Sequence, residues 1–155
     1  MTLVHDYDGE MTSTEGEKTV GSPLAEALER VGDRWTLLVI EGLMGGPRRF
    51  SDLQEELPGI APNILSQRLK HLEKEALVRA RPYSDRPPRV SYELTAAGSA
   101  LAGALRLLAQ WGARQSDTVE APRHSSCGTP MEARWYCPTC ARVVDDQERA
   151  DLRFV

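Results

Sequence analysis

The chain has 155 residues, of which 41% are hydrophobic and 27% are charged, and its formal net charge is −4. This length provides for one ordinary hydrophobic core and a small appended module. No apolar run is long enough to span a membrane, and the N-terminal residues lack the plan of a signal peptide, so we expect a cytoplasmic protein without membrane contacts.

The charge is distributed unevenly along the chain. Residues 1–20 carry five acidic side chains against Lys18, whereas residues 47–92 hold nine Lys and Arg against six acids, a net of +3. Nucleic-acid binding depends on the local potential rather than on the total charge. The acidic chain as a whole therefore does not exclude DNA as a partner.

The N-terminal part predicts a tail followed by two helices. Residues 1–20 are polar, acidic and aperiodic, which is typical of a disordered segment. A first helix should begin at Pro23 and end at Gly32. Asp33 suits the N-cap of a second helix, 34–44, whose nearly continuous apolar run indicates a central buried helix.

The next segment predicts a helix-turn-helix. A short strand at 48–50 should lead into a helix over 52–57 capped by Ser51, and Pro58, Gly59 and Ile60 make a turn. A second helix then begins at Pro62, with an apolar face formed by Leu65, Leu69, Leu72 and Ala76. Two short helices joined by a tight turn that contains glycine are typical of this motif.

The outer face of the second helix carries no carboxylate. Asn and Gln can pair with adenine edges and Lys with guanine or phosphate, although a solvated helix face would show the same pattern. We expect base-edge contacts from Asn63, Ser66, Gln67 and Lys70, and phosphate or minor-groove contacts from Arg48, Arg49, Lys74, Arg86 and Arg89. His71 on the same helix is expected to flank the DNA or contact a phosphate.

Two strands should follow the recognition helix. The stretches 78–82 and 90–94 read as strands, the second with clean alternation, and the basic loop 83–89 between them is stiffened by two prolines. A strand pair placed directly after a recognition helix predicts a wing.

A long helix over 96–115, capped by Thr95, should come next, with two apolar faces. Two faces predict two partners, the domain core and a second copy of the chain, although one broad face covering the core is the alternative. The side chains that we expect in a homodimer interface are Leu101, Leu105, Leu108 and Trp111.

All three cysteines lie near the C-terminus, in a pattern typical of metal ligands. His124 and Cys127 form an H-x2-C pair, and Cys137 and Cys140 a C-x2-C pair, around an expected strand at 131–136. Four such ligands suit one structural, tetrahedral Zn²⁺ per chain with no position left for water. A thiol sensor that uses the same cysteines, or inert thiols, are the alternatives.

These patterns predict a fold that is mainly α with a small antiparallel β wing, in the α+β class. The expected parts are a tail (1–20), a winged helix-turn-helix and dimerisation domain (21–115), a linker (116–122), a zinc-ribbon-like module (123–147) and a C-terminal tail (148–155).

Five stretches of the chain resemble the HxlR-type family of bacterial winged helix-turn-helix regulators, relatives of the MarR group. They are PLAEAL (23–28), VGDRWTLL (31–38), GPRRFSDL (46–53), PGIAPNILSQRL (58–69) and PPRVSYELTAAG (87–98). The resemblance spans residues 22–112 and implies operator binding by homodimers whose terminal helices form much of the interface. Such proteins act as repressors or activators.

Two positions depart from the family pattern. The family often has a cysteine before the first Pro-Leu, which senses oxidants in some members, and Ser22 stands there instead. Ala61 replaces the serine that is usual before Pro62, a loss of N-cap oxygen that should cost about 1 kcal/mol of helix stability.

The sequence thus predicts a sequence-specific DNA-binding transcriptional regulator, acting as a homodimer on a near-palindromic operator and expected to repress. No catalytic constellation is visible, so we do not expect an enzyme, and a zinc-dependent one is disfavoured by the closed ligand set. A winged-helix module that only binds proteins and a redox sensor based on the C-terminal cysteines are the alternatives. The sequence leaves room for a small-molecule effector without identifying one.

Overall fold

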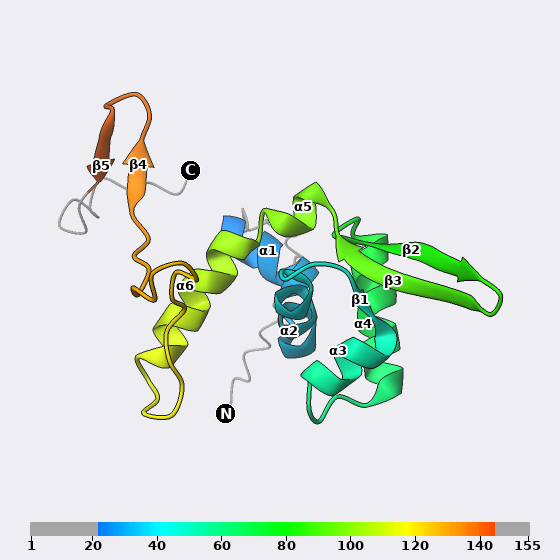
Figure 1. Cartoon of the computed structure of the whole chain (residues 1–155). Helices are drawn as coiled ribbons and strands as arrows, with labels where there is room; N and C mark the ends of the chain where they lie inside the picture. The colour runs from blue at the N-terminus through cyan, green and yellow to red at the C-terminus, as the bar shows by residue number, and fades with distance from the viewer. Residues whose placement is uncertain (1–21, 145–155) are drawn as a thin grey trace, which may run out of the picture.

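The computed structural model describes residues 22–144 (Figure 1). The expected tails, 1–20 and 148–155, lie outside these residues. No helix within 22–144 is long and apolar enough to cross a membrane. The elements are α1 (Pro23–Val31), α2 (Arg34–Leu43), β1 (Arg48–Arg49), α3 (Phe50–Glu56), α4 (Pro62–Lys74), β2 (Val78–Asp85), β3 (Pro88–Leu94), α5 (Ala96–Ser99), α6 (Ala102–Ala113), β4 (Trp135–Cys137) and β5 (Arg142–Val144). This is the predicted α+β winged helix-turn-helix.

The first helices begin at the expected residues because side-chain oxygens satisfy their free N–H groups. Ser22 Oγ accepts the N–H of Ala25 at 3.1 Å, and Asp33 Oδ1 accepts that of Thr36 at 3.1 Å. The prediction for α3 was wrong by two residues: Asp52 reaches back to the Arg49 N–H at 3.0 Å and fixes an earlier start, so Ser51 lies inside the helix.

Helix α4 begins at Pro62 as predicted, with Ala61 at an N-cap that makes no side-chain hydrogen bond. It ends at Lys74, so Ala76 does not continue the apolar face as expected. Ala76 instead adopts φ 56° and is exposed, and the Leu77 N–H donates back to the Leu72 carbonyl at 2.9 Å. This is the left-handed helix end of a Schellman-type turn, reached here without glycine.

The core lies where α2, α3 and α4 meet the sheet. Leu65, Leu69 and Leu72 of α4 are at most 1% exposed, and they share the core with Ile40 of α2 and Leu53 of α3. Burying each such side chain contributes about 1.5–3 kcal/mol. Helix α4 is therefore fixed along its whole inner face, and its outer face is presented in one orientation.

The larger sheet has the order β1-β3-β2 and is antiparallel. Strands β2 and β3 are longer than predicted, because their pairing continues from Val78↔Leu94 to Asp85↔Pro88 and leaves only Arg86 and Pro87 as a turn. Pro82 is tolerated within β2 because β2 is an edge strand. The expected basic loop 83–89 is thus largely strand, and the wing projects as one hairpin (Figure 1).

The expected single helix over 96–115 is broken into α5 and α6. A Cβ on Gly98 would lie 2.1 Å from the Leu77 carbonyl oxygen, which shows how closely α5 is seated against the start of β2. The Leu101 N–H then donates to the Gly98 carbonyl, three residues back, in a tight turn that redirects the chain. Leu101 and Leu105 can in this way pack against the core beside α2.

The C-terminal segment forms a second, two-stranded sheet of β4 and β5. Strand β4 covers Trp135–Cys137 rather than the expected 131–136. Figure 1 shows this hairpin at the end of the molecule opposite the wing.

Candidate nucleic-acid interface

The outer face of α4 carries the predicted base-reading side chains. Asn63, Gln67, Lys70 and Lys74 are exposed and Ser66 is half-buried. Helix α4 has 13 residues and is about 20 Å long, and the B-DNA major groove admits a helix of ordinary width. The structure therefore brings Asn63, Ser66, Gln67 and Lys70 together on one accessible, acid-free surface, which we call the α4 face.

Two polar contacts hold the back of α4 in place. Arg68 Nε lies 3.3 Å from Asp33 Oδ1, so the recognition helix is tied to the N-cap of α2. His71 Nε2 lies 2.7 Å from the carbonyl oxygen of Arg30 at the end of α1. One ring nitrogen of His71 is thus engaged with the backbone of α1, and the expected contact of His71 with the DNA flank or a phosphate stays a prediction.

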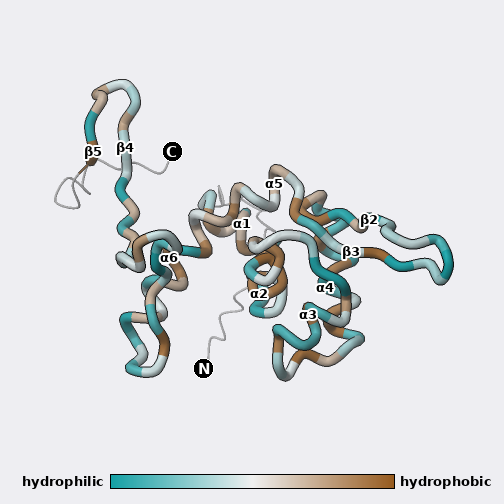
Figure 2. Tube along the Cα trace, viewed as in Figure 1, coloured by the Kyte–Doolittle hydropathy of each residue, from teal (hydrophilic) through white to brown (hydrophobic). Residues whose placement is uncertain are grey.

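The wing presents two predicted phosphate contacts, Arg86 at its turn and Arg89 at the start of β3. Both are exposed, and within residues 22–144 neither makes an ion pair. Figure 2 shows the tip of the hairpin as a hydrophilic stretch. Guanidinium groups of this kind on a projecting hairpin suit contacts to phosphate or to a narrow minor groove.

The two arginines of β1 have different surroundings. Arg48 Nε donates to Glu56 at 2.9 Å, so this predicted phosphate contact is already ion-paired within the domain. Arg49 is exposed, and its guanidinium lies 4.9 Å from the centroid of the Tyr83 ring in β2. That cation–π contact joins β1 to the wing and was not expected from the sequence.

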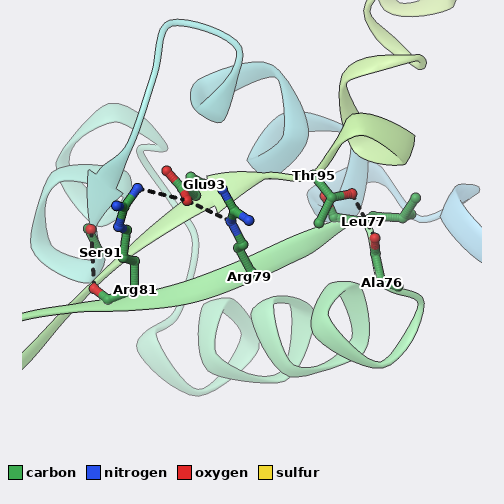
Figure 3. A network of polar contacts seen from close by, with 7 residues as sticks. All are labelled: Ala76, Leu77, Arg79, Arg81, Ser91, Glu93 and Thr95. Atoms are coloured by element: carbon green, nitrogen blue, oxygen red, sulfur yellow. Dashed lines mark hydrogen bonds and ion pairs between the residues drawn. The ribbon is translucent and has the colours of Figure 1, made fainter.

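The outer face of the sheet carries a network that sequence reasoning missed (Figure 3). Glu93 Oε1 accepts from Arg79 Nε at 2.6 Å and lies 3.5 Å from Arg81 Nη1. The three side chains point away from α4, on the far side of the strands. All three residues lie within the strands predicted at 78–82 and 90–94, so alternation places Arg79 and Arg81 on one face of β2, but the cross-strand register that sets Arg79 opposite Glu93 was not predicted.

The opposite face of β3 carries Tyr92, which lies toward α4. Burial raises the pKa of Tyr92, and the negative charge of Glu73 on α4 raises it further. Tyr92 therefore packs against the core beside α4 in its neutral form.

The four predicted dimer residues fall into two groups. Leu101 and Leu105 pack against the core of their own chain. Leu108 and Trp111 are 54% and 58% exposed. Other large apolar side chains exposed on the two outer helices are Leu24 and Leu28 of α1 and Leu107 of α6.

The predicted metal ligands lie in two separate pairs. His124 Nδ1 is 3.3 Å from Cys127 Sγ, and the backbone N–H and thiol of Cys140 hydrogen-bond to the Cys137 sulfur. Hydrogen bonds with Thr129 lower the pKa of Cys127. The pKa of Cys137 is lowered mainly by its hydrogen bonds with Cys140. Within residues 22–144 no three His, Cys, Asp or Glu side chains are gathered around one metal position.

Comparison with known proteins gives consistent matches across the winged domain. Residues 30–120 match the model of the HxlR-like helix-turn-helix family. An uncharacterized HTH-type transcriptional regulator of Mycobacterium tuberculosis is 39% identical over 128 residues, 80% of each chain. The HTH-type transcriptional regulator YodB of Bacillus subtilis is 34% identical over 93 residues, 60% of this chain and 83% of YodB.

Solved structures agree with these matches. Reduced YodB superposes with a TM-score of 0.53 at 33% identity, covering 63% of this chain and 97% of YodB. PA1607, which has been proposed to be a transcription factor, gives a TM-score of 0.69 at 26% identity, covering 84% of this chain and 94% of PA1607. The matched family model spans α2 to α6, including the recognition helix and the wing, and the chain belongs to the HxlR-like helix-turn-helix family.

Proposed function

We propose that this protein is a sequence-specific DNA-binding transcriptional regulator that acts as a homodimer on a near-palindromic operator. The observation that carries the proposal is the α4 face, an exposed, acid-free polar surface on a helix whose other side is locked into the core. The relatives described as HTH-type transcriptional regulators support it.

Readout is divided between the helix and its surroundings. Asn63, Ser66, Gln67 and Lys70 contact base edges in the major groove, because they share the α4 face and carry donors and acceptors that can pair with base edges. Phosphate contacts come from Lys74, Arg49, Arg86 and Arg89. Arg48 contributes less than expected from its charge alone, since Glu56 neutralises it.

Dimerisation places two α4 helices on one side of the DNA. The exposed apolar side chains of α6, Leu107, Leu108 and Trp111, supply the contact between chains, together with Leu24 and Leu28 of α1. A two-fold axis through this surface presents the helices to successive major grooves, with half-sites about 10 bp apart or a multiple of that. The operator is then nearly palindromic.

We expect repression rather than activation, because repression needs no further protein partner. A dimer that occupies two half-sites covers roughly 20 bp of promoter and blocks access by occupancy alone. A module that binds only proteins is the competing function. Lys70, Lys74, Arg86 and Arg89 form no ion pair within residues 22–144, and this positive charge favours DNA over that alternative.

Footprinting on the DNA that flanks the protein's own gene tests the proposal. We expect one protected near-palindrome. The logarithm of the binding constant should fall linearly with the logarithm of the salt concentration, because binding to phosphates releases counterions. Absence of protection throughout these regions, together with salt-independent or undetectable binding to random duplex, would favour the protein-interaction module.

A further inference from the structure

The segment 123–144 contains two turns of the same construction. In each, two candidate ligands are separated by two residues and followed by a residue in the left-handed region: Gly128 at φ 69° after His124 and Cys127, and Ala141 at φ 52° after Cys137 and Cys140. An alanine adopts this conformation at a cost that a glycine does not have. The second turn therefore keeps the geometry of the first even where the residue type opposes it.

Both turns also close small antiparallel hairpins in the same register. The His124 N–H donates to the Thr129 carbonyl at 2.9 Å, inside the bridge Arg123↔Pro130. Cys137 pairs with Arg142 at the end of β4 and β5. In both turns the first ligand thus faces the residue five positions later.

The first pair already has the spacing of two ligands on one metal. Zn–N and Zn–S bonds of about 2.0 and 2.3 Å at a tetrahedral angle place the two ligand atoms about 3.5 Å apart. His124 Nδ1 and Cys127 Sγ are 3.3 Å apart. In the second pair the backbone N–H groups of Thr139 and Cys140 hydrogen-bond to the Cys137 sulfur, so the turn holds this sulfur in place.

The segment has no core of its own that would explain these turns. Trp135, Tyr136 and Val143 of the β4–β5 hairpin are 64%, 61% and 46% exposed, and Val144 is only half-buried. An isolated two-stranded hairpin is marginally stable at best in water, and modules of this size usually depend on a metal or disulfides.

We propose that the two turns are the halves of one tetrahedral Zn²⁺ site with His124, Cys127, Cys137 and Cys140 as ligands of the same chain. Met131 is held by Gln110 Nε2, which donates to its carbonyl at 2.6 Å, whereas residues 132–134 belong to no helix or strand. Closing the site therefore requires a bend at 132–134 that brings the second turn onto the first. Metal binding then supplies the folding free energy that the exposed hairpin lacks. The proposal is independent of DNA binding, because all four ligands lie outside the winged domain.

Metal analysis of the reduced, full-length protein tests this site. We expect about one zinc per chain, and Co²⁺ in its place should give the intense visible bands of a tetrahedral thiolate complex. His124→Ala, Cys127→Ser, Cys137→Ser and Cys140→Ser should each lower Co²⁺ affinity by at least about 100-fold, more than loss of a supporting contact does. Ser125→Ala, a change in the first turn that removes no ligand, is the matched control and should leave the affinity unchanged.

Three results would overturn the proposal. The first is less than half an equivalent of zinc with three freely titrating thiols, which would favour a thiol sensor based on Cys137 and Cys140. The second is an octahedral Co²⁺ spectrum in the wild-type protein, a readout that does not depend on whether any variant folds. The third is a loss of Co²⁺ affinity in a monomeric Leu108→Asp protein, which would place the site between chains.

Discussion

Replacing Leu108 with Asp should separate the dimer without unfolding the chain. Leu108 is 54% exposed, and full burial of a leucine contributes about 1.5–3 kcal/mol, so covering its exposed half contributes about 1 kcal/mol per chain. The two-fold axis doubles this to about 2 kcal/mol. Two carboxylates placed in the same apolar contact add a desolvation penalty of about 1 kcal/mol or more each. We therefore expect the dimer to weaken by about 4 kcal/mol, on the order of 1,000-fold in Kd.

Leu105→Asp is the matched comparison on the same helix. Leu105 packs against the core of its own chain, so a charge there should lower the free energy of unfolding rather than only dissociate the dimer. Sedimentation equilibrium measures the association, and urea unfolding measures the stability of each variant. A Leu108→Asp protein that stays dimeric, or that loses as much stability as Leu105→Asp, would refute the assignment of this surface.

Three further outcomes follow from the contacts of the winged domain. Arg86→Ala and Arg89→Ala should weaken binding to all DNA sequences and reduce the salt slope of the dimer by about two units, one contact per chain, measured by anisotropy titration. His71→Ala removes the hydrogen bond to the Arg30 carbonyl and should cost about 1 kcal/mol in urea unfolding, and unchanged stability would contradict the bond. Burial and the carboxylate of Glu73 raise the pKa of Tyr92 above 10.0, the ordinary pKa of a tyrosine. The neutral phenol therefore stabilises the fold fully below pH 10.0, and this stabilisation is lost as the pH rises through the pKa of the folded protein. Tyr92→Phe should flatten that alkaline loss, and an unchanged alkaline profile would contradict the assignment.

The starts of α1, α2 and α4 could be predicted because local chemistry decides them. Ser22, Asp33 and Pro62 act within one turn of the chain, and the structure places them at or next to the start of α1, α2 and α4. The α4 face could be predicted for the same reason, since its spacing follows from the helical period alone. The family resemblance was confirmed over the winged domain.

The features that escaped prediction depend on contacts distant in sequence. The break between α5 and α6 follows from the close seating of Gly98 against Leu77. The full length of the wing follows from cross-strand pairing that continues past Pro82. His71 faces the Arg30 carbonyl, 41 residues away, and no pattern within α4 indicates it.

The division of the terminal helices was missed for a related reason. The apolar periodicity indicated two apolar faces on α6, but it did not indicate which of the two packs against the core. The structure assigns Leu101 and Leu105 to the core and leaves Leu108 and Trp111 exposed.

The central claim, that α4 reads base edges, is tested most directly by the affinity of Gln67→Ala for the operator and for random duplex of equal length. Gln67 is exposed in the middle of the α4 face, and the change leaves the buried leucines on the other side of the helix untouched. We predict a loss of about 1–3 kcal/mol on the operator with unchanged binding to random DNA, because a base contact carries specificity and a phosphate contact does not. An equal loss on both DNAs, or no loss on either, would contradict the claim.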